Sequence, residues 1–125
     1  MAPGRIDYRM QRRALLRDVV SGQRERGGVC DAHPDLLRAG THLGRPATEP
    51  CPLCGADQLR QVTYVFERKG RRSPGGRAVP HESLPRQVER YGDLDVYTVE
   101  VCLACAWHHL LESYALPTGG SSQVG

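Results

Sequence analysis

The chain has 125 residues, of which 39% are hydrophobic, and a formal net charge of +3 at pH 7. A single Phe and a single Trp against 14 Gly and 9 Pro indicate one domain with a small core that needs a staple, either metal or disulfide. No apolar run is long enough for a membrane span, and no apolar stretch follows the basic N-terminus, as a secretory signal would require. We therefore expect a cytoplasmic protein in which paired cysteines bind metal.

The charge is distributed unevenly along the chain. Residues 1–26 carry a net charge of +4, residues 60–80 carry +5, and residues 81–125 carry −4. Such asymmetry is typical of proteins with a polyanionic partner, and two segments of this chain are candidates for contacting one.

In the N-terminal part, two helices are predicted. Residues 7–20 place apolar side chains on one side at helical spacing and arginines on the other sides, and Gly22 follows as a stop. Residues 34–39 form a short second helix, with His33 or Asp31 near its start and Gly40 at its end. Residues 40–50 have turn composition and lead into the sequence CPLCG.

In the C-terminal part, alternation predicts strands over residues 58–67 and 95–103. Between them we expect a flexible basic loop over residues 68–80 and a helix over residues 83–91. Residues 104–116 carry an i, i+3, i+4, i+7 apolar stripe, which predicts a C-terminal helix. The apolar residues of this stripe are Trp107, Leu110, Leu111 and Tyr114.

Two CxxC units predict a metal site, in which Cys51 and Cys54 join Cys102 and Cys105. Four thiolates in two such turns are typical of a structural Zn²⁺ site with tetrahedral geometry. A strand leaves the first turn and another strand arrives at the second, so antiparallel pairing would bring both turns to one end of the sheet. That arrangement is a zinc ribbon.

Several alternatives accompany this interpretation. The four cysteines could be free and buried, could hold iron as rubredoxin-like CPxCG turns do, or could include a redox pair. Cys30, the fifth cysteine, could replace a ligand, act as a reactive thiol or lie in the core. His108 and His109 could be half-exposed on an amphipathic helix, one of them could donate to a cysteine sulfur, or one could bind the metal.

Signatures of catalysis are lacking in the sequence. There is no phosphate-binding glycine loop leading into a helix, no HExxH and no GxSxG. A zinc ion with four sulfur ligands has no open position for water, so we expect a protein that is not an enzyme and has no small-molecule substrate.

The basic segments are candidates for contact with phosphates through bidentate hydrogen bonds and counterion release. A solvated helix face and a disordered loop are the alternative interpretation. The candidate contact residues are Arg9, Arg12, Arg13, Arg17, Arg68, Lys69, Arg71, Arg72 and Arg77.

Three segments carry a resemblance to a known family: VCDAHPDLLRAG (29–40), CPLCG (51–55) and VEVCLACAWHHLLESYAL (99–116). Over residues 5–116 the chain resembles an uncharacterised family of short actinobacterial proteins, a domain of unknown function. The resemblance implies a bacterial cytosolic setting, four cysteines that act together and a Cys30 segment that belongs to the shared core. It implies no activity.

The sequence thus predicts an α+β protein, a small zinc ribbon with an N-terminal and a C-terminal helix, in one structural domain. Its regions are an N-terminal helical part (1–50), the ribbon with its basic loop and helical insert (51–116) and a disordered tail (117–125). The predicted role is a non-catalytic zinc-binding module for nucleic acid or a nucleoprotein machine such as RNA polymerase or the ribosome. The alternatives are an adaptor for an acidic protein and a redox- or zinc-responsive switch built on Cys30 beside the metal site.

Overall fold

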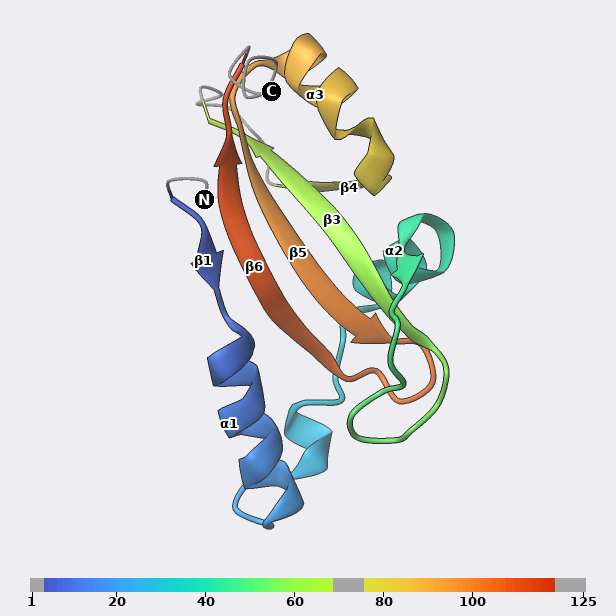
Figure 1. The fold of residues 1–125 in the computed structure, drawn as a ribbon. Helices are drawn as coiled ribbons and strands as arrows, with labels where there is room; N and C mark the ends of the chain where they lie inside the picture. Colours follow the sequence, from blue (N-terminus) through green and yellow to red (C-terminus); the bar gives the residue numbers. More distant parts are fainter. Residues whose placement is uncertain (1–3, 69–75, 119–125) are drawn as a thin grey trace.

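The computed structural model describes residues 4–68 and 76–118 (Figure 1). Within these residues, three α-helices and a six-stranded antiparallel sheet make up an α+β fold, as the sequence predicts. The strand order is β1–β6–β5–β3–β2, and β4 also pairs with β3.

Three long strands form the centre of the sheet: β3 (Leu59–Glu67), β5 (Leu94–Cys102) and β6 (His108–Leu116). β3 and β5 pair antiparallel, with Leu59 opposite Cys102. The CxxC turn before β3 and the one after β5 therefore meet at the same end of the sheet. Strands β3 and β5 confirm the two strands predicted from the sequence, and the meeting of the turns confirms the predicted pairing.

The predicted C-terminal helix over residues 104–116 is wrong, because most of this segment forms β6. The second CxxC turn reverses the chain. The N–H of Cys102 donates to the carbonyl of Trp107 (2.8 Å), and β6 runs back along β5. Because the chain reverses here, residues of this segment can pair with β5, which they could not do as a helix.

A β-bulge explains why the spacing in this segment is ambiguous. Leu110 lies opposite Val99 and Glu112 lies opposite Thr98, so Leu111 is the extra residue. The bulge shifts the alternation by one position. The same apolar spacing therefore suits a helix and a bulged strand.

The other three predicted helices are present as α1 (Arg9–Val20), α2 (Pro34–Leu43) and α3 (Leu84–Tyr91). α1 begins later than predicted, since the preceding residues pair with β6 as β1 (Ile6–Asp7). α2 begins at the predicted cap, where His33 accepts a hydrogen bond from the backbone of Asp35 (3.0 Å).

The shorter elements flank the sheet. β2 (Arg45–Pro46) and β4 (Arg77–Val79) both pair with β3, and two 3₁₀ turns, η1 (Arg26–Gly28) and η2 (His81–Ser83), precede α2 and α3. The predicted turn over 40–50 and loop over 68–80 are therefore wrong in part, because α2 and the two short strands take up some of their residues. Residues 69–75 of that loop and 119–125 of the predicted tail lie outside the described residues.

The core lies on both faces of the sheet. Val62 and Val65 point to opposite faces because their separation along β3 is odd. Val62 packs in the cluster that includes residues of α2, whereas Val65 packs in the cluster that includes residues of α3. A third cluster, named here the Trp107 cluster, joins Trp107 to α1, Cys51 and Cys102, so the cysteine turns are continuous with the core.

Across the two stretches that the structure describes, no helix combines the length and apolar character that crossing a bilayer requires.

Candidate metal centre

The first CxxC turn is a tight knuckle closed by its own backbone. The N–H of Gly55 donates to the carbonyl of Cys51, and the N–H of Cys51 donates to the carbonyl of Ala56, both at 3.0 Å. The Cys51 sulfur accepts from the backbone of Leu53 (3.4 Å) and of Cys54 (3.5 Å). Gly55 has φ +75°, a conformation that glycine adopts without a Cβ clash. The turn thus aims both cysteine sulfurs the same way.

The second CxxC turn repeats this geometry. The N–H of Ala106 donates to the carbonyl of Cys102 (2.9 Å), and the Cys102 sulfur accepts from the backbone of Ala104 (3.4 Å). Ala106 has φ +68° and occupies the position equivalent to Gly55, four residues after the first cysteine. It is the only described non-glycine residue in this conformation. Two segments that lie far apart in the sequence therefore have the same knuckle geometry.

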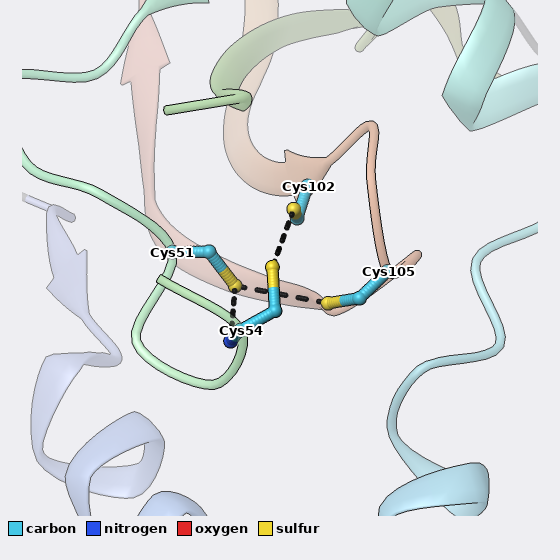
Figure 2. A group of neighbouring side chains, drawn as sticks. All are labelled: Cys51, Cys54, Cys102 and Cys105. Atoms are coloured by element: carbon cyan, nitrogen blue, oxygen red, sulfur yellow. Dashed lines mark hydrogen bonds between the residues drawn. The ribbon is translucent and has the colours of Figure 1, made fainter. Parts of the chain in front are cut away.

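The two knuckles bring four sulfurs together (Figure 2). Cys51 Sγ lies 3.7 Å from Cys105 Sγ, and Cys54 Sγ lies 3.6 Å from Cys102 Sγ. All four sulfurs lie within 4.8 Å of one another. Tetrahedral coordination with Zn–S bonds of about 2.3 Å places sulfurs about 3.8 Å apart, so this donor set fits a metal of that size. The four cysteines could hold one metal ion.

Burial sets the electrostatics of the thiols. It raises the pKa of Cys102, which is fully buried, and the pKa of Cys105. At the exposed Cys54 a backbone hydrogen bond from Ala56 lowers the pKa instead. Buried thiolates need a compensating positive charge, and a divalent cation bound by the four sulfurs would supply it.

Cys30 is a fifth thiol beside this group. It follows η1, is half-buried, and its sulfur lies 3.9 Å from the sulfur of Cys105. It packs against the Trp107 cluster, in agreement with the core placement among the three predicted alternatives. Arg26 lies close by, and its pKa is raised by Cys30 foremost and also by Cys105. Sequence spacing does not predict the contact between Cys30 and Cys105, because the two cysteines lie 75 positions apart.

Neither histidine of the predicted pair belongs to the four-cysteine group found in the described residues. His108 Nε2 lies 2.9 Å from Asp31 Oδ1, which connects β6 to the segment carrying Cys30. His109 stacks on Trp107 with ring centroids 5.9 Å apart, and its Nδ1 lies 2.7 Å from the carbonyl oxygen of Leu110. Both lie on β6 rather than on a helix.

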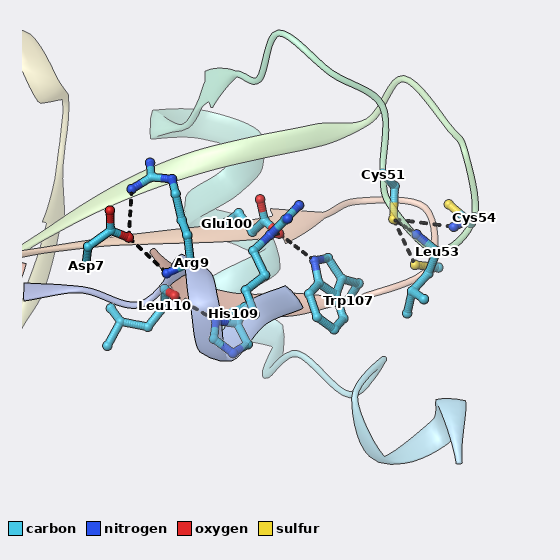
Figure 3. A network of polar contacts seen from close by, with 11 residues as sticks. Asp7, Arg9, Cys51, Leu53, Cys54, Glu100, Trp107, His109 and Leu110 are labelled. Carbon is cyan, nitrogen blue, oxygen red and sulfur yellow. Dashed lines mark hydrogen bonds and ion pairs between the residues drawn. The ribbon is translucent and has the colours of Figure 1, made fainter. Parts of the chain in front are cut away.

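A buried carboxylate contacts Trp107 and was missed by the sequence interpretation (Figure 3). Glu100 is 3% exposed, and its Oε2 accepts from Trp107 Nε1 (2.7 Å) and Arg12 Nε (2.6 Å). The sequence did contain a signal for the burial of this carboxylate, because Glu100 precedes Cys102 by two residues and therefore lies on the same face of β5.

The candidate contact residues lie in two separate places. Arg9, Arg12, Arg13 and Arg17 belong to α1, at the knuckle end of the sheet, whereas Arg68 and Arg77 lie at the other end of β3 (Figure 1). The remaining candidates, Lys69, Arg71 and Arg72, lie outside the described residues.

Most of the described candidates are engaged within the protein. Arg9 pairs with Asp7, Arg68 pairs with Asp95 (3.0 Å), and Arg77 pairs with Glu67 (3.4 Å). Arg12 turns inward to Glu100. Among the described residues, Arg13 and Arg17 have no carboxylate within ion-pair distance. The candidate arginines that remain unpaired there therefore both lie on α1.

Comparisons with known proteins find one family of unknown function and several mycobacterial relatives. The family described as "Family of unknown function (DUF5318)" matches residues 3–124. Uncharacterised proteins of Mycobacterium bovis and of two strains of Mycobacterium tuberculosis are each 42% identical over 112 residues, which cover 89% of this chain and 80% of theirs. No solved structure matches.

Proposed function

The chain belongs to the family of unknown function DUF5318, and from the geometry of its site we propose a non-catalytic binding module stabilised by one structural zinc ion. Cys51, Cys54, Cys102 and Cys105 are the proposed ligands. The observation that carries the proposal is the pair of equivalent knuckles, which bring four sulfurs within 4.8 Å of one another. We also propose that the knuckles and strands β3 and β5 form a zinc ribbon.

A four-sulfur shell favours zinc in a structural role. Four thiolates fill the tetrahedral coordination of Zn²⁺ and leave no position for water or substrate. Such a site holds chain segments together rather than activating a nucleophile.

The metal centre would stabilise a core that contains few large apolar side chains. It would link the loop before β3 to the β5–β6 hairpin. One ligand from each of these segments, Cys51 and Cys102, is buried in the Trp107 cluster. Metal binding contributes on the order of 10 kcal/mol to folding in small zinc domains. We therefore propose that the metal-free chain loses the packing of the Trp107 cluster.

Metal analysis of the protein purified under reducing conditions tests this proposal. We expect one zinc per chain, and loss of both metal and cooperative unfolding in Cys102→Ser. Cys30→Ser is the matched control, since it removes a neighbouring thiol outside the four-cysteine group, and it should retain one zinc. A folded, metal-free wild-type protein would contradict the proposal. A content of one iron per chain would show that the four cysteines bind iron instead of zinc.

For the partner, we propose nucleic acid, alone or within RNA polymerase or the ribosome, bound through the outer face of α1. Arg13 and Arg17 lie one helical turn apart, and neither has an ion pair within the described residues, so both remain available to phosphates. Met10 and Val20, 68% and 78% exposed, lie on the same helix and leave an apolar surface beside the charge. An acidic protein that meets this face is the alternative.

Binding of single-stranded RNA and DNA at rising salt tests the partner. We expect affinity to fall steeply with salt, and Arg13→Gln/Arg17→Gln to lower it about tenfold at low salt. Arg86→Gln/Arg90→Gln on α3 is the matched control, because it removes the same charge from another helix, and it should have little effect. Absence of binding at low salt would refute the nucleic-acid proposal, and an acidic protein captured in stoichiometric amount would favour the adaptor.

A further inference from the structure

The segment around Cys30 is attached to the second knuckle on both sides of the cysteine. Before it, Val29 is 4% exposed and packs in the Trp107 cluster. After it, Asp31 contacts His108 (2.9 Å), and the N–H of Ala32 donates to the carbonyl of Ala106 (3.0 Å). These contacts hold the backbone of Cys30 beside Cys105, so their proximity is built into the fold.

The Cys30 sulfur therefore touches a sulfur of the metal centre without belonging to the four-cysteine group. It lies 3.9 Å from Cys105 Sγ, close to the 3.7 Å that separates Cys105 from its neighbour Cys51. A disulfide has a sulfur–sulfur distance of about 2.05 Å. Cys30 and Cys105 thus need to approach by about 2 Å to be joined, a small displacement for two side chains.

We propose that Cys30 is a peroxide-sensitive modification site, whose oxidation joins it to Cys105 and releases the metal. This inference rests on the zinc centre proposed above. In the proposed centre the other four sulfurs bind the metal, whereas Cys30 is half-buried and lies outside that group, so its sulfur stays free to react with an oxidant.

The reaction takes two steps and uses one hydrogen peroxide. Cys30 attacks one oxygen of the peroxide as its thiolate, and a sulfenic acid forms as the O–O bond breaks. The leaving hydroxide takes up the proton released from the Cys30 thiol and becomes water. The Cys105 thiolate then attacks the sulfenic sulfur. The S–S bond forms, the S–O bond breaks, and the oxygen leaves as hydroxide, which takes up a proton to become water. Two electrons pass from the two sulfurs to the peroxide.

The disulfide removes one of four ligands. Cys105 can no longer donate as a thiolate, and the remaining three sulfurs leave the tetrahedral shell incomplete. The metal is then held less tightly and dissociates. A dithiol reductant reverses the change by restoring both thiols.

The test uses the full-length zinc-loaded protein and hydrogen peroxide. Zinc release is followed by the absorbance of a chromogenic chelator, and disulfides are located by mass spectrometry of peptides. We expect wild-type release to accompany a Cys30–Cys105 disulfide and to reverse with dithiothreitol. In Cys30→Ser and Cys30→Ala, release should be slower by about fivefold or more.

The controls separate this inference from the zinc proposal. Both variants should contain one zinc before peroxide is added, which shows that the centre is intact. Equal release rates in wild type and both variants would overturn the modification site, as would a disulfide formed only among Cys51, Cys54, Cys102 and Cys105. Both outcomes leave the zinc centre standing, whereas absence of zinc before oxidation would overturn the zinc proposal itself.

Discussion

The Nε atom of Arg12 lies 2.6 Å from Oε2 of Glu100, where α1 meets the sheet. The Glu100 side chain is 4% exposed and the Arg12 side chain 22%, and the same oxygen accepts from Trp107 Nε1. The pair ties α1 to β5 at the edge of the Trp107 cluster. The ion pair with Arg12 also explains why the Glu100 carboxylate can be buried on the same face of β5 as Cys102.

Replacing Arg12 should therefore destabilise the protein. In Arg12→Met the Glu100 carboxylate stays buried with one fewer hydrogen bond and no counter-charge, so we expect the free energy of unfolding to fall by about 2 kcal/mol. Arg13→Met, at the next and exposed position, should change it by less than about 0.5 kcal/mol. Urea unfolding of the zinc-loaded proteins measures both, and equal effects would show that the pair contributes nothing.

A glycine of α2 allows the helix to approach the sheet. A Cβ added at Gly40 would lie 2.9 Å from Val101 Cγ1 and 3.2 Å from Leu103 Cδ2. We expect Gly40→Ala to lower the free energy of unfolding by about 1–2 kcal/mol, because the overpacking outweighs the gain in helix propensity.

The matched control for this substitution is Gly27→Ala. Nothing lies within 4 Å of a Cβ at Gly27, and that glycine has no positive φ. Its stability should change little. If thermal unfolding shows Gly40→Ala to be as stable as wild type, the close approach of α2 to β5 is not a tight constraint.

The sequence identifies the parts of this fold that depend on local spacing. Strands β3 and β5 follow from alternation, and the meeting of the two CxxC turns follows from antiparallel pairing of those strands. β6 was missed, since the bulge at Leu111 gives a bulged strand the apolar spacing of a helix. Only the reversal at the second knuckle, a tertiary feature, decides between them.

The site was predictable to a similar extent. Its four cysteines carry a spacing signal, but the positions of Cys30 and Arg12 depend on contacts with residues 75 and 88 positions away. An arginine on an amphipathic helix looks solvent-exposed until the carboxylate opposite it is known. The charge pattern therefore overstated the basic surface of α1.

The equivalence of Gly55 and Ala106 predicts how the knuckles tolerate substitution. Nothing lies within 4 Å of a Cβ at Gly55, so Gly55→Ala adds only the conformational cost of φ +75°. We expect a loss of about 1 kcal/mol with the metal content unchanged, because Ala106 already holds this conformation in the other knuckle.

A β-branched residue at the same position serves as the contrast. Gly55→Val should cost clearly more than Gly55→Ala, since positive φ is least compatible with a branched Cβ. Metal analysis and thermal unfolding of both variants measure this. Loss of metal in Gly55→Ala would mean that the two knuckles are not equivalent in what they tolerate.

The last prediction concerns His81, whose Nδ1 lies 3.4 Å from Oγ1 of Thr63, a residue in the middle of β3. Burial is the main cause that lowers its pKa, and the positive charge of Arg45 lowers it further, while Glu82 and Glu112 oppose the shift. The folded protein therefore favours neutral His81.

The sign of the resulting pH dependence follows from proton binding. An unfolded histidine has a pKa of about 6.5, so below that value the unfolded chain binds more protons at this position than the folded chain. The contribution of His81 to stability is complete above about pH 6.5 and is lost as the pH falls towards the folded pKa. The free energy of unfolding should rise with pH across this window.

His81→Gln should remove this part of the slope. We expect the difference in unfolding free energy between wild type and His81→Gln to be larger at about pH 8 than at about pH 5.5. Proton competition at the cysteines affects both proteins alike and cancels in the difference. Parallel profiles from urea unfolding across this range would show that His81 titrates equally in the folded and unfolded chains.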